Sequence, residues 1–103
     1  MTFNEPPWVP IRDPRMLKML GKLAEELGEA SAIVARSIIQ GVDGSNPKTG
    51  KINRDALQEE LCDVLALICV TSHELSMSAL VMRERIEMKK EMFESWALFD
   101  PPP

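Results

Sequence analysis

The sequence predicts an all-α protein, and three stretches of helical pattern carry that prediction. Apolar residues recur at intervals of three and four between residues 17 and 38. A second helical stretch runs from about residue 53 to 73, and a third continues to about residue 98. With 103 residues and a net charge of −4, the chain is expected to form one small domain, residues 1–103, whose partner is not a nucleic-acid polymer.

The two ends of the chain are expected to lie outside the helices. Residues 1–13 contain three prolines and are predicted to form an extended arm, with Phe3 and Trp8 as its apolar contacts. Residues 99–103 end in three prolines and are predicted to be a flexible tail.

The first helix is predicted to begin at Asp13-Pro14, because Asp is a good N-cap and Pro fits the first helical position. Gly41 is predicted to end it. Its apolar stripe consists of Leu17, Leu20, Leu23, Leu27, Ala30, Val34 and Ile38.

Residues 42–52 are a loop by composition, with Gly44, Asn46-Pro47 and Gly50. The loop carries Lys48 and Lys51, for which two interpretations stay open. Either the lysines are solvated, or they bring positive charge to an anionic substrate.

The second helix is predicted to be capped by Asn53 or Asp55, to begin acidic and to become apolar on every side. A helix that is apolar all round must be covered all round, so we expect a homo-oligomer, either a homodimer or a homotetramer. Cys62 and Cys69 are expected to be buried free thiols, which favours a cytoplasmic location. No apolar run is long enough to cross a membrane, and the single histidine, His73, is expected to be structural.

The third helix is predicted to begin at Ser76 or Ser78 and to be the basic helix of the protein. Its cations, among them Arg83 and Lys89, either pair with glutamates on the same helix or hold a phosphate group.

Two acidic half-motifs are the main functional signal. They read Glu25-Glu26-Leu27-Gly28-Glu29 and Glu59-Glu60-Leu61-Cys62-Asp63. Helical positions three apart share one face, so each half-motif presents a pair of carboxylates. The predicted metal ligands are Glu26, Glu29, Glu60 and Asp63, with Glu25 and Glu59 alongside. The alternative is that these are surface acids or form salt bridges between helices.

Charge neighbours favour the metal site. Glu29, Glu60 and Asp63 each have an acid but no cation at helical spacing, whereas Lys22 can pair with Glu25 or Glu26. A buried carboxylate needs a proton or a counter-charge. Oxygen ligands without nearby histidine or cysteine favour Mg²⁺ or Mn²⁺ over zinc, and Mg²⁺ commonly binds together with substrate phosphates. The sequence therefore predicts a polyphosphate substrate, and two reactions stay open: hydrolysis of a nucleoside triphosphate, or phosphoryl transfer to another acceptor.

The two half-motifs, within roughly residues 17–90, resemble the MazG-like family of all-α nucleoside triphosphate pyrophosphohydrolases, whose relatives include dimeric dUTPases and dCTP pyrophosphatases. The resemblance implies a helical bundle completed by homo-oligomerisation, with Mg²⁺ or a substituting Mn²⁺ on the four predicted ligands. It implies that Glu25 or Glu59 assists a metal ligand or the attacking water, and that a (d)NTP is cleaved to monophosphate and pyrophosphate. The last helix of the family often supplies a lysine and a nearby asparagine or arginine to the phosphates, for which Arg83, Arg85 and Lys89 are the candidates here. Residues 30–59 make a long separation between the half-motifs, and the last helix lacks asparagine.

The nucleobase is the least constrained part of the prediction. A base needs an apolar or aromatic slot, and Trp8 and Trp96 are the aromatic candidates, with Trp8 taken as the base-binding residue, although packing is the commoner role of such a tryptophan. The short chain favours a purine dNTP such as dGTP or dATP. The alternative function is a non-catalytic helical oligomer that binds nucleotides or a protein partner.

Overall fold

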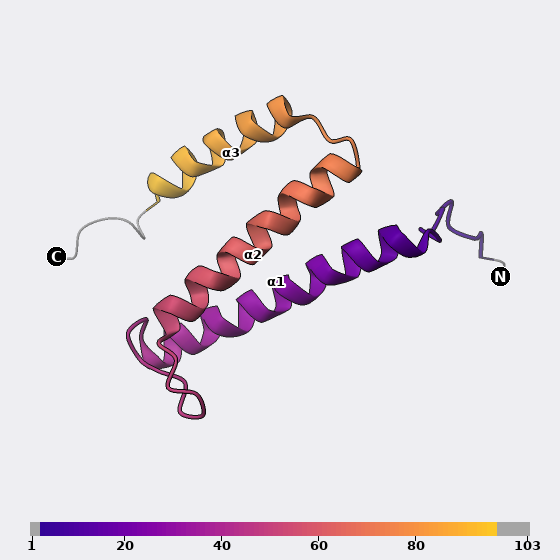
Figure 1. The fold of residues 1–103 in the computed structure, drawn as a ribbon. Helices are drawn as coiled ribbons and strands as arrows, with labels where there is room; N and C mark the ends of the chain where they lie inside the picture. The colour runs from indigo at the N-terminus through magenta and orange to yellow at the C-terminus, as the bar shows by residue number, and fades with distance from the viewer. Residues whose placement is uncertain (1–2, 97–103) are drawn as a thin grey trace. The chain divides into compact units, whose positions relative to one another are not determined.

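The computed structural model describes residues 3–96, which form three α-helices and no strand, and the all-α prediction is confirmed. The helices are α1 (Pro14–Gln40), α2 (Asn53–Glu74) and α3 (Ala79–Glu94) (Figure 1). The chain divides into two compact units, the first ending at Thr71 and the second beginning at Ser72. The two acidic half-motifs both lie in the first unit.

Both ends of α1 follow the sequence prediction. Asp13 is the N-cap, and its Oδ1 accepts a hydrogen bond from the backbone N–H of Arg15 at 3.1 Å. Pro14 occupies the first helical position. The helix ends at Gly41, whose φ of 86° favours glycine and whose N–H donates to the carbonyl of Ser37 at 2.8 Å.

The described part of the N-terminal arm, residues 3–13, has no regular structure, as predicted. The expectation that Phe3 and Trp8 make its apolar contacts is wrong, because their exposed fractions are 85% and 78%. A short extended arm held by no ladder of hydrogen bonds leaves these rings in solvent. The predicted tail, residues 99–103, and the predicted helix end near Leu98 lie outside the described residues.

The loop between α1 and α2 is closed by a single antiparallel bridge between Ser45 and Ile52. A fork of two hydrogen bonds, from Arg54 Nε and Nη2 to the two carboxylate oxygens of Asp43, ties it to α2 at 3.0 and 3.2 Å. The loop turns tightly at Gly44, where a Cβ atom would collide with the carbonyl oxygen of Gln40.

Asn53 anchors the start of α2 by a contact that the sequence did not predict. It is the first residue of the helix, fully buried, and its Nδ2 donates to Gln40 Oε1 and to the Gly41 carbonyl, both at 3.0 Å. The side chain of Asn53 is therefore used to join the end of α1 to the start of α2. The predicted capping by Asn53 is wrong, because Asn53 is the first residue of the helix and its Oδ1, the atom that would cap the helix, accepts no hydrogen bond within the described residues.

Helices α1 and α2 run antiparallel from this junction (Figure 1). Six residues are buried among the described ones, and four of them are polar or charged. The apolar pair is Ala30 and Val64; the polar set is Glu26, Asn53, Glu60 and Thr71. A contact between two helices normally buries an apolar stripe. Burying two glutamates there instead marks this stretch as the place to look for a site.

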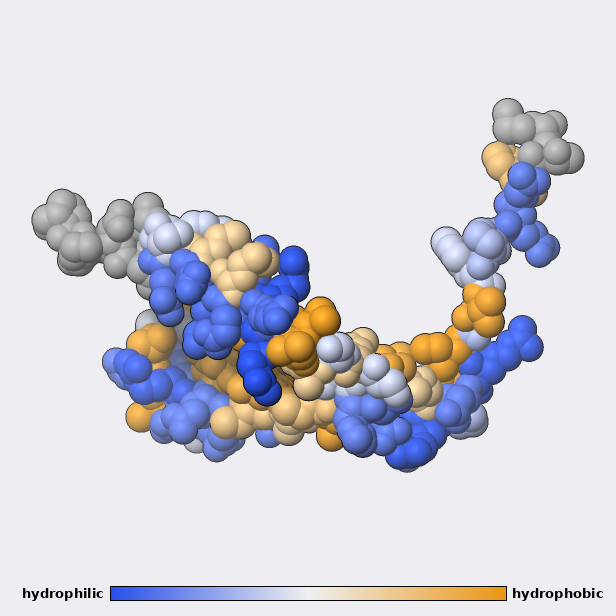
Figure 2. Space-filling model, turned by 90° about the horizontal axis from the view of Figure 1, so that it is seen from above, coloured by the Kyte–Doolittle hydropathy of each residue, from blue (hydrophilic) through white to orange (hydrophobic). Residues whose placement is uncertain are grey.

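Part of the remaining surface of α2 is apolar and exposed. Leu61, Leu65 and Val70 are 48%, 61% and 50% exposed. Neither Cys62 nor Cys69 forms a disulfide within the described residues, and both are exposed, so the expectation of buried thiols is wrong: both lie on helix positions that α1 does not cover. Figure 2 shows apolar side chains interleaved with hydrophilic ones on the face that it displays.

Helix α3 begins after Ser78, whose Oγ accepts a hydrogen bond from the N–H of Val81 at 3.2 Å. It ends at Glu94, earlier than predicted, where Ser95 caps it. No residue of α3 is buried. Phe93 and Trp96 meet edge to face, with ring centroids 4.9 Å apart. None of the helices in the described range is long and apolar enough to span a membrane.

Candidate metal centre

The candidate site is centred on Glu26 of α1 and Glu60 of α2. Their exposed fractions are 7% and 8%, although glutamate is rarely buried unless paired. Each lies one helical turn before a small buried apolar residue, Ala30 or Val64, so the helices approach closely at this level. The rotation of each helix that buries the apolar residue also buries the glutamate four positions before it.

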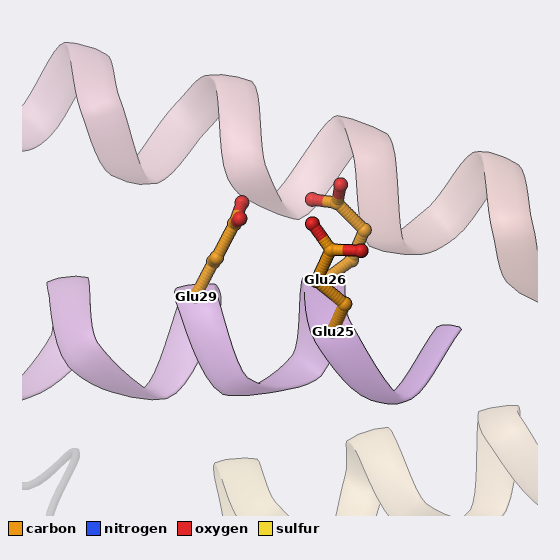
Figure 3. A group of neighbouring side chains, drawn as sticks. All are labelled: Glu25, Glu26 and Glu29. Carbon is orange, nitrogen blue, oxygen red and sulfur yellow. The ribbon is translucent and has the colours of Figure 1, made fainter. Parts of the chain in front are cut away.

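Five acids of the half-motifs form two overlapping groups. Carboxylate oxygens of Glu26, Glu60 and Asp63 lie within 4.8 Å of one another, and those of Glu25, Glu26 and Glu29 do the same. Figure 3 shows Glu25, Glu26 and Glu29 extending from α1 on the side of α2. Glu26 belongs to both groups. The four predicted metal ligands are therefore brought together through Glu26, with Glu29 and Asp63 on the exposed rim.

Two buried oxygens of the cluster have no hydrogen-bond partner within the described part of the chain: Glu26 Oε2 and Glu60 Oε1. Two ionised carboxylates offer each other no donor, so the pair needs a shared proton or a cation. The hydrogen bond between Glu26 and a protonated Glu60, then burial and the charges of Glu26, Glu29 and Asp63, raise the pKa of Glu60 to about 7. The same hydrogen bond, followed by that from Lys22, lowers the pKa of Glu26.

Lys22 lies at the rim of this cluster. Its Nζ is 3.1 Å from Glu26 Oε1 and 3.5 Å from Glu25 Oε1. The hydrogen bond to Glu26, with the charges of both acids, raises the pKa of the Lys22 ammonium. The spacing of three and four residues predicted these ion pairs, but Lys22 was not among the predicted site residues.

Glu59 forms an ion pair with Lys51 and belongs to neither of the two acid groups found among the described residues. Both side chains are exposed, Glu59 by 66%. Lys51 is thus paired with an acid of the second half-motif, and the interpretation that the loop brings positive charge to an anionic substrate stays a prediction. Lys48 lies on the loop and is exposed. The backbone N–H of Lys48 donates a hydrogen bond to Asn46 Oδ1 at 2.9 Å.

The other predicted contacts lie elsewhere in the chain. Arg83 and Lys89 are on α3 in the second unit, and Lys89 Nζ is 4.0 Å from Met92 Sδ. Lys90 pairs with Glu87 at 3.6 Å, which agrees with the expectation that α3 cations meet glutamates of their own helix. Trp8 is exposed in the N-terminal arm.

An apolar groove of about 310 Å³ lies along α2 beside the loop, and sequence reasoning did not find it. Its polar members, Arg54 and Gln58, accompany five largely apolar residues: Val42, Leu57, Leu61, Cys62 and Leu65. The signal for the groove in the sequence was the apolar side chains all round the second helix, which were interpreted only as a contact between subunits.

The fold and the cluster together define an all-α protein with carboxylates gathered between two antiparallel helices. Such an arrangement offers oxygen donors of the kind that hard divalent cations prefer. No family model, no curated protein and no solved structure matches this chain. The resemblance carried by the half-motifs therefore stays a prediction.

Proposed function

We propose that this protein is a metal-dependent hydrolase that converts a (d)NTP, with a lean toward purine dNTPs such as dGTP or dATP, to the monophosphate and pyrophosphate. The observation that carries the proposal is the burial of Glu26 and Glu60 from two helices, with unpaired oxygens beside Asp63. A purely structural contact between helices gains nothing from placing two acids there. The resemblance of the half-motifs to the MazG-like family points to the same chemistry.

The donor set fits Mg²⁺ or Mn²⁺. Glu26, Glu60 and Asp63 supply oxygens from both helices, and Glu29 supplies a further one through the group that it forms with Glu26. Glu26 Oε2 and Glu60 Oε1 are buried oxygens without a hydrogen-bond partner among the described residues, and a cation that they ligate would satisfy them. When bound, the cation supplies Lewis-acid polarisation of phosphate oxygens and lowers the pKa of a water.

The hydrolysis needs a group that accepts the proton of the attacking water as the bridging bond between the α and β phosphorus atoms breaks. Glu25 and Glu59 are the candidates, since both lie beside ligand positions and remain exposed. Each forms an ion pair with a lysine, Glu25 with Lys22 and Glu59 with Lys51. The leaving oxygen departs with the pyrophosphate.

The substrate contacts outside the metal are further parts of the proposal. Lys48 and Lys51 on the loop, and Arg83 and Lys89 on α3, would bind phosphate oxygens, and Trp8 would stack on the base. These side chains are exposed, with Lys89 half-buried, so they are accessible to a ligand.

We also propose that the chain works as a homo-oligomer, a dimer or tetramer, in the cytoplasm. Among the described residues, only Ala30 and Val64 are buried and hydrophobic, which is too small a core for a stable isolated chain. The exposed apolar surface of α2 needs a partner to cover it. A second copy of the chain is the partner that we propose, because most oligomers of this kind are assembled from identical chains. Two exposed cysteines that form no disulfide within the described residues suit a reducing compartment.

A pyrophosphate-release assay over the eight common NTPs and dNTPs tests the proposed function. We expect monophosphate and pyrophosphate with Mg²⁺ or Mn²⁺, and none with chelator. Release of orthophosphate would keep the metal site but refute cleavage between the α and β phosphorus atoms. Nucleotide binding without turnover of any substrate would favour the alternative, a non-catalytic helical oligomer.

A further inference from the structure

Lys22 is the one cation of the described residues that contacts the carboxylate groups centred on Glu26. Its side chain is 52% exposed, whereas that of Glu26 is 10% exposed. The ammonium thus lies between a buried carboxylate and solvent. A ligand that approaches Glu26 from this side meets the ammonium first.

Glu26 divides its two oxygens between different surroundings. Oε1 accepts from Lys22 at 3.1 Å, while Oε2 is buried and has no partner within residues 3–96. The carboxylate also lies within 4.8 Å of those of Glu60 and Asp63. The Glu26 carboxylate can therefore ligate a cation through Oε2 while Oε1 gives up its contact with Lys22.

We propose that Lys22 is an anion-binding residue of the site, which exchanges Glu26 for a phosphate oxygen of the substrate when a divalent cation occupies the carboxylate cluster. This inference rests on the proposed function. Once Glu26 serves the cation, its charge is shared and its hold on Lys22 weakens, so the ammonium is free to bind another anion. Polyphosphate is that anion, because it accompanies the cation and carries several oxygens within reach of a second positive group.

The charge balance of the site supports this exchange. Five carboxylates make up the two acid groups, and one ammonium, that of Lys22, contacts two of them, Glu25 and Glu26. A polyphosphate approaching them is repelled unless cations separate it from the acids. Lys22 is fixed in that position by the same helix that carries three of the acids, so its placement does not depend on a partner or on a mobile loop.

The test compares Lys22→Met with wild type in two binding measurements. Mn²⁺ alone is titrated and followed by electron paramagnetic resonance, and inorganic tripolyphosphate is titrated by calorimetry at saturating Mn²⁺. We expect Lys22→Met to bind Mn²⁺ at least as tightly as wild type, because a competing positive charge is gone. We expect it to bind tripolyphosphate about tenfold more weakly, as for one lost charge-assisted hydrogen bond.

Two further variants sharpen the comparison. Lys22→Arg keeps the positive charge and should retain most of the tripolyphosphate affinity. Lys18→Met removes an exposed lysine one turn earlier on α1 and should change neither measurement.

Each outcome decides the matter. Unchanged tripolyphosphate binding by Lys22→Met, with Mn²⁺ binding intact, overturns the inference and leaves the metal site standing. Loss of Mn²⁺ binding by Lys22→Met would mean that Lys22 only holds Glu26 in place, and also overturns it. If wild type binds no Mn²⁺, the proposed function itself fails and the inference falls with it.

Discussion

Glu26 on α1 and Glu60 on α2 meet in the buried contact between the two helices, and their pKa values move in opposite directions. The pKa of Glu60 rises to about 7, chiefly through Glu26, whereas the pKa of Glu26 falls through Glu60 and Lys22. One proton held between two carboxylates accounts for both changes. A divalent cation at the same place would remove the need for that proton.

The first prediction concerns the stability of the protein in chelator as pH changes. Because the pKa of Glu60 is raised from 4.5 to about 7, the native state binds more protons than the unfolded state between these values. The contribution of Glu60 is therefore fully present below about pH 4.5 and is lost as pH rises through 7. The melting temperature should fall by a few degrees from pH 5 to pH 7.5.

Glu60→Gln is the matched variant for this measurement, since it keeps the shape and cannot ionise. It should abolish most of the fall and melt higher than wild type at pH 7.5. Every other titratable side chain is present in both proteins, so the difference between them isolates Glu60. Parallel curves for the two proteins would contradict the buried carboxyl pair.

The second prediction concerns metal and turnover. Asp63→Asn removes a charged ligand from the group that it forms with Glu26 and Glu60. We expect Mn²⁺ affinity and the rate of pyrophosphate release each to fall at least about 100-fold, because a neutral amide is a poorer ligand for a hard cation. Asp55→Asn, the same change at an exposed position of α2, should leave both near wild type.

Circular dichroism and thermal melting without metal accompany that comparison. Asp63 is exposed, so its substitution should leave the fold intact and the chelated protein at least as stable as wild type. Asp63→Asn with wild-type turnover would show that the catalytic site lies elsewhere.

Much of this architecture follows from local sequence. Asp13-Pro14 and Gly41 delimit α1 because caps act through neighbouring backbone groups, which a sequence displays directly. The two half-motifs likewise follow from helical spacing. The burial of Glu26 and Glu60, with Glu29 and Asp63 at the rim, depends on how each helix is rotated against the other, and local spacing does not encode that rotation.

The misjudged features also depend on contacts distant in sequence. Asn53 looked like a cap, but its amide reaches Gln40 and Gly41, which only the folded loop brings near. The thiols of Cys62 and Cys69 were expected inside because their neighbours are apolar, yet α1 covers the opposite face of α2. Periodicity reports which residues share a face and leaves open what covers that face.

The third prediction tests Asn53 as the anchor of the loop. Asn53→Ala removes two hydrogen bonds and leaves the Gly41 carbonyl without its side-chain donor. We expect the free energy of unfolding, measured by urea denaturation, to fall by about 1–3 kcal/mol. Asn46→Ala, which removes one bond to the backbone of Lys48 within the loop, should cost less, below about 1 kcal/mol. Equal effects of the two substitutions would argue against a special role for the buried amide.

The fourth prediction concerns the apolar surface of α2. Leu65 lines the groove and is 61% exposed in one chain, so in a monomer its replacement should change stability by no more than about 0.5 kcal/mol. If a second copy covers this face, Leu65→Lys buries a charge in the interface, and the oligomer should dissociate at micromolar concentration. Light scattering coupled to gel filtration measures this, with Val9→Lys in the N-terminal arm as the control that should keep the wild-type mass. A wild-type chain that is monomeric throughout would refute the assembly, and an unchanged mass for Leu65→Lys would place the contact on another face.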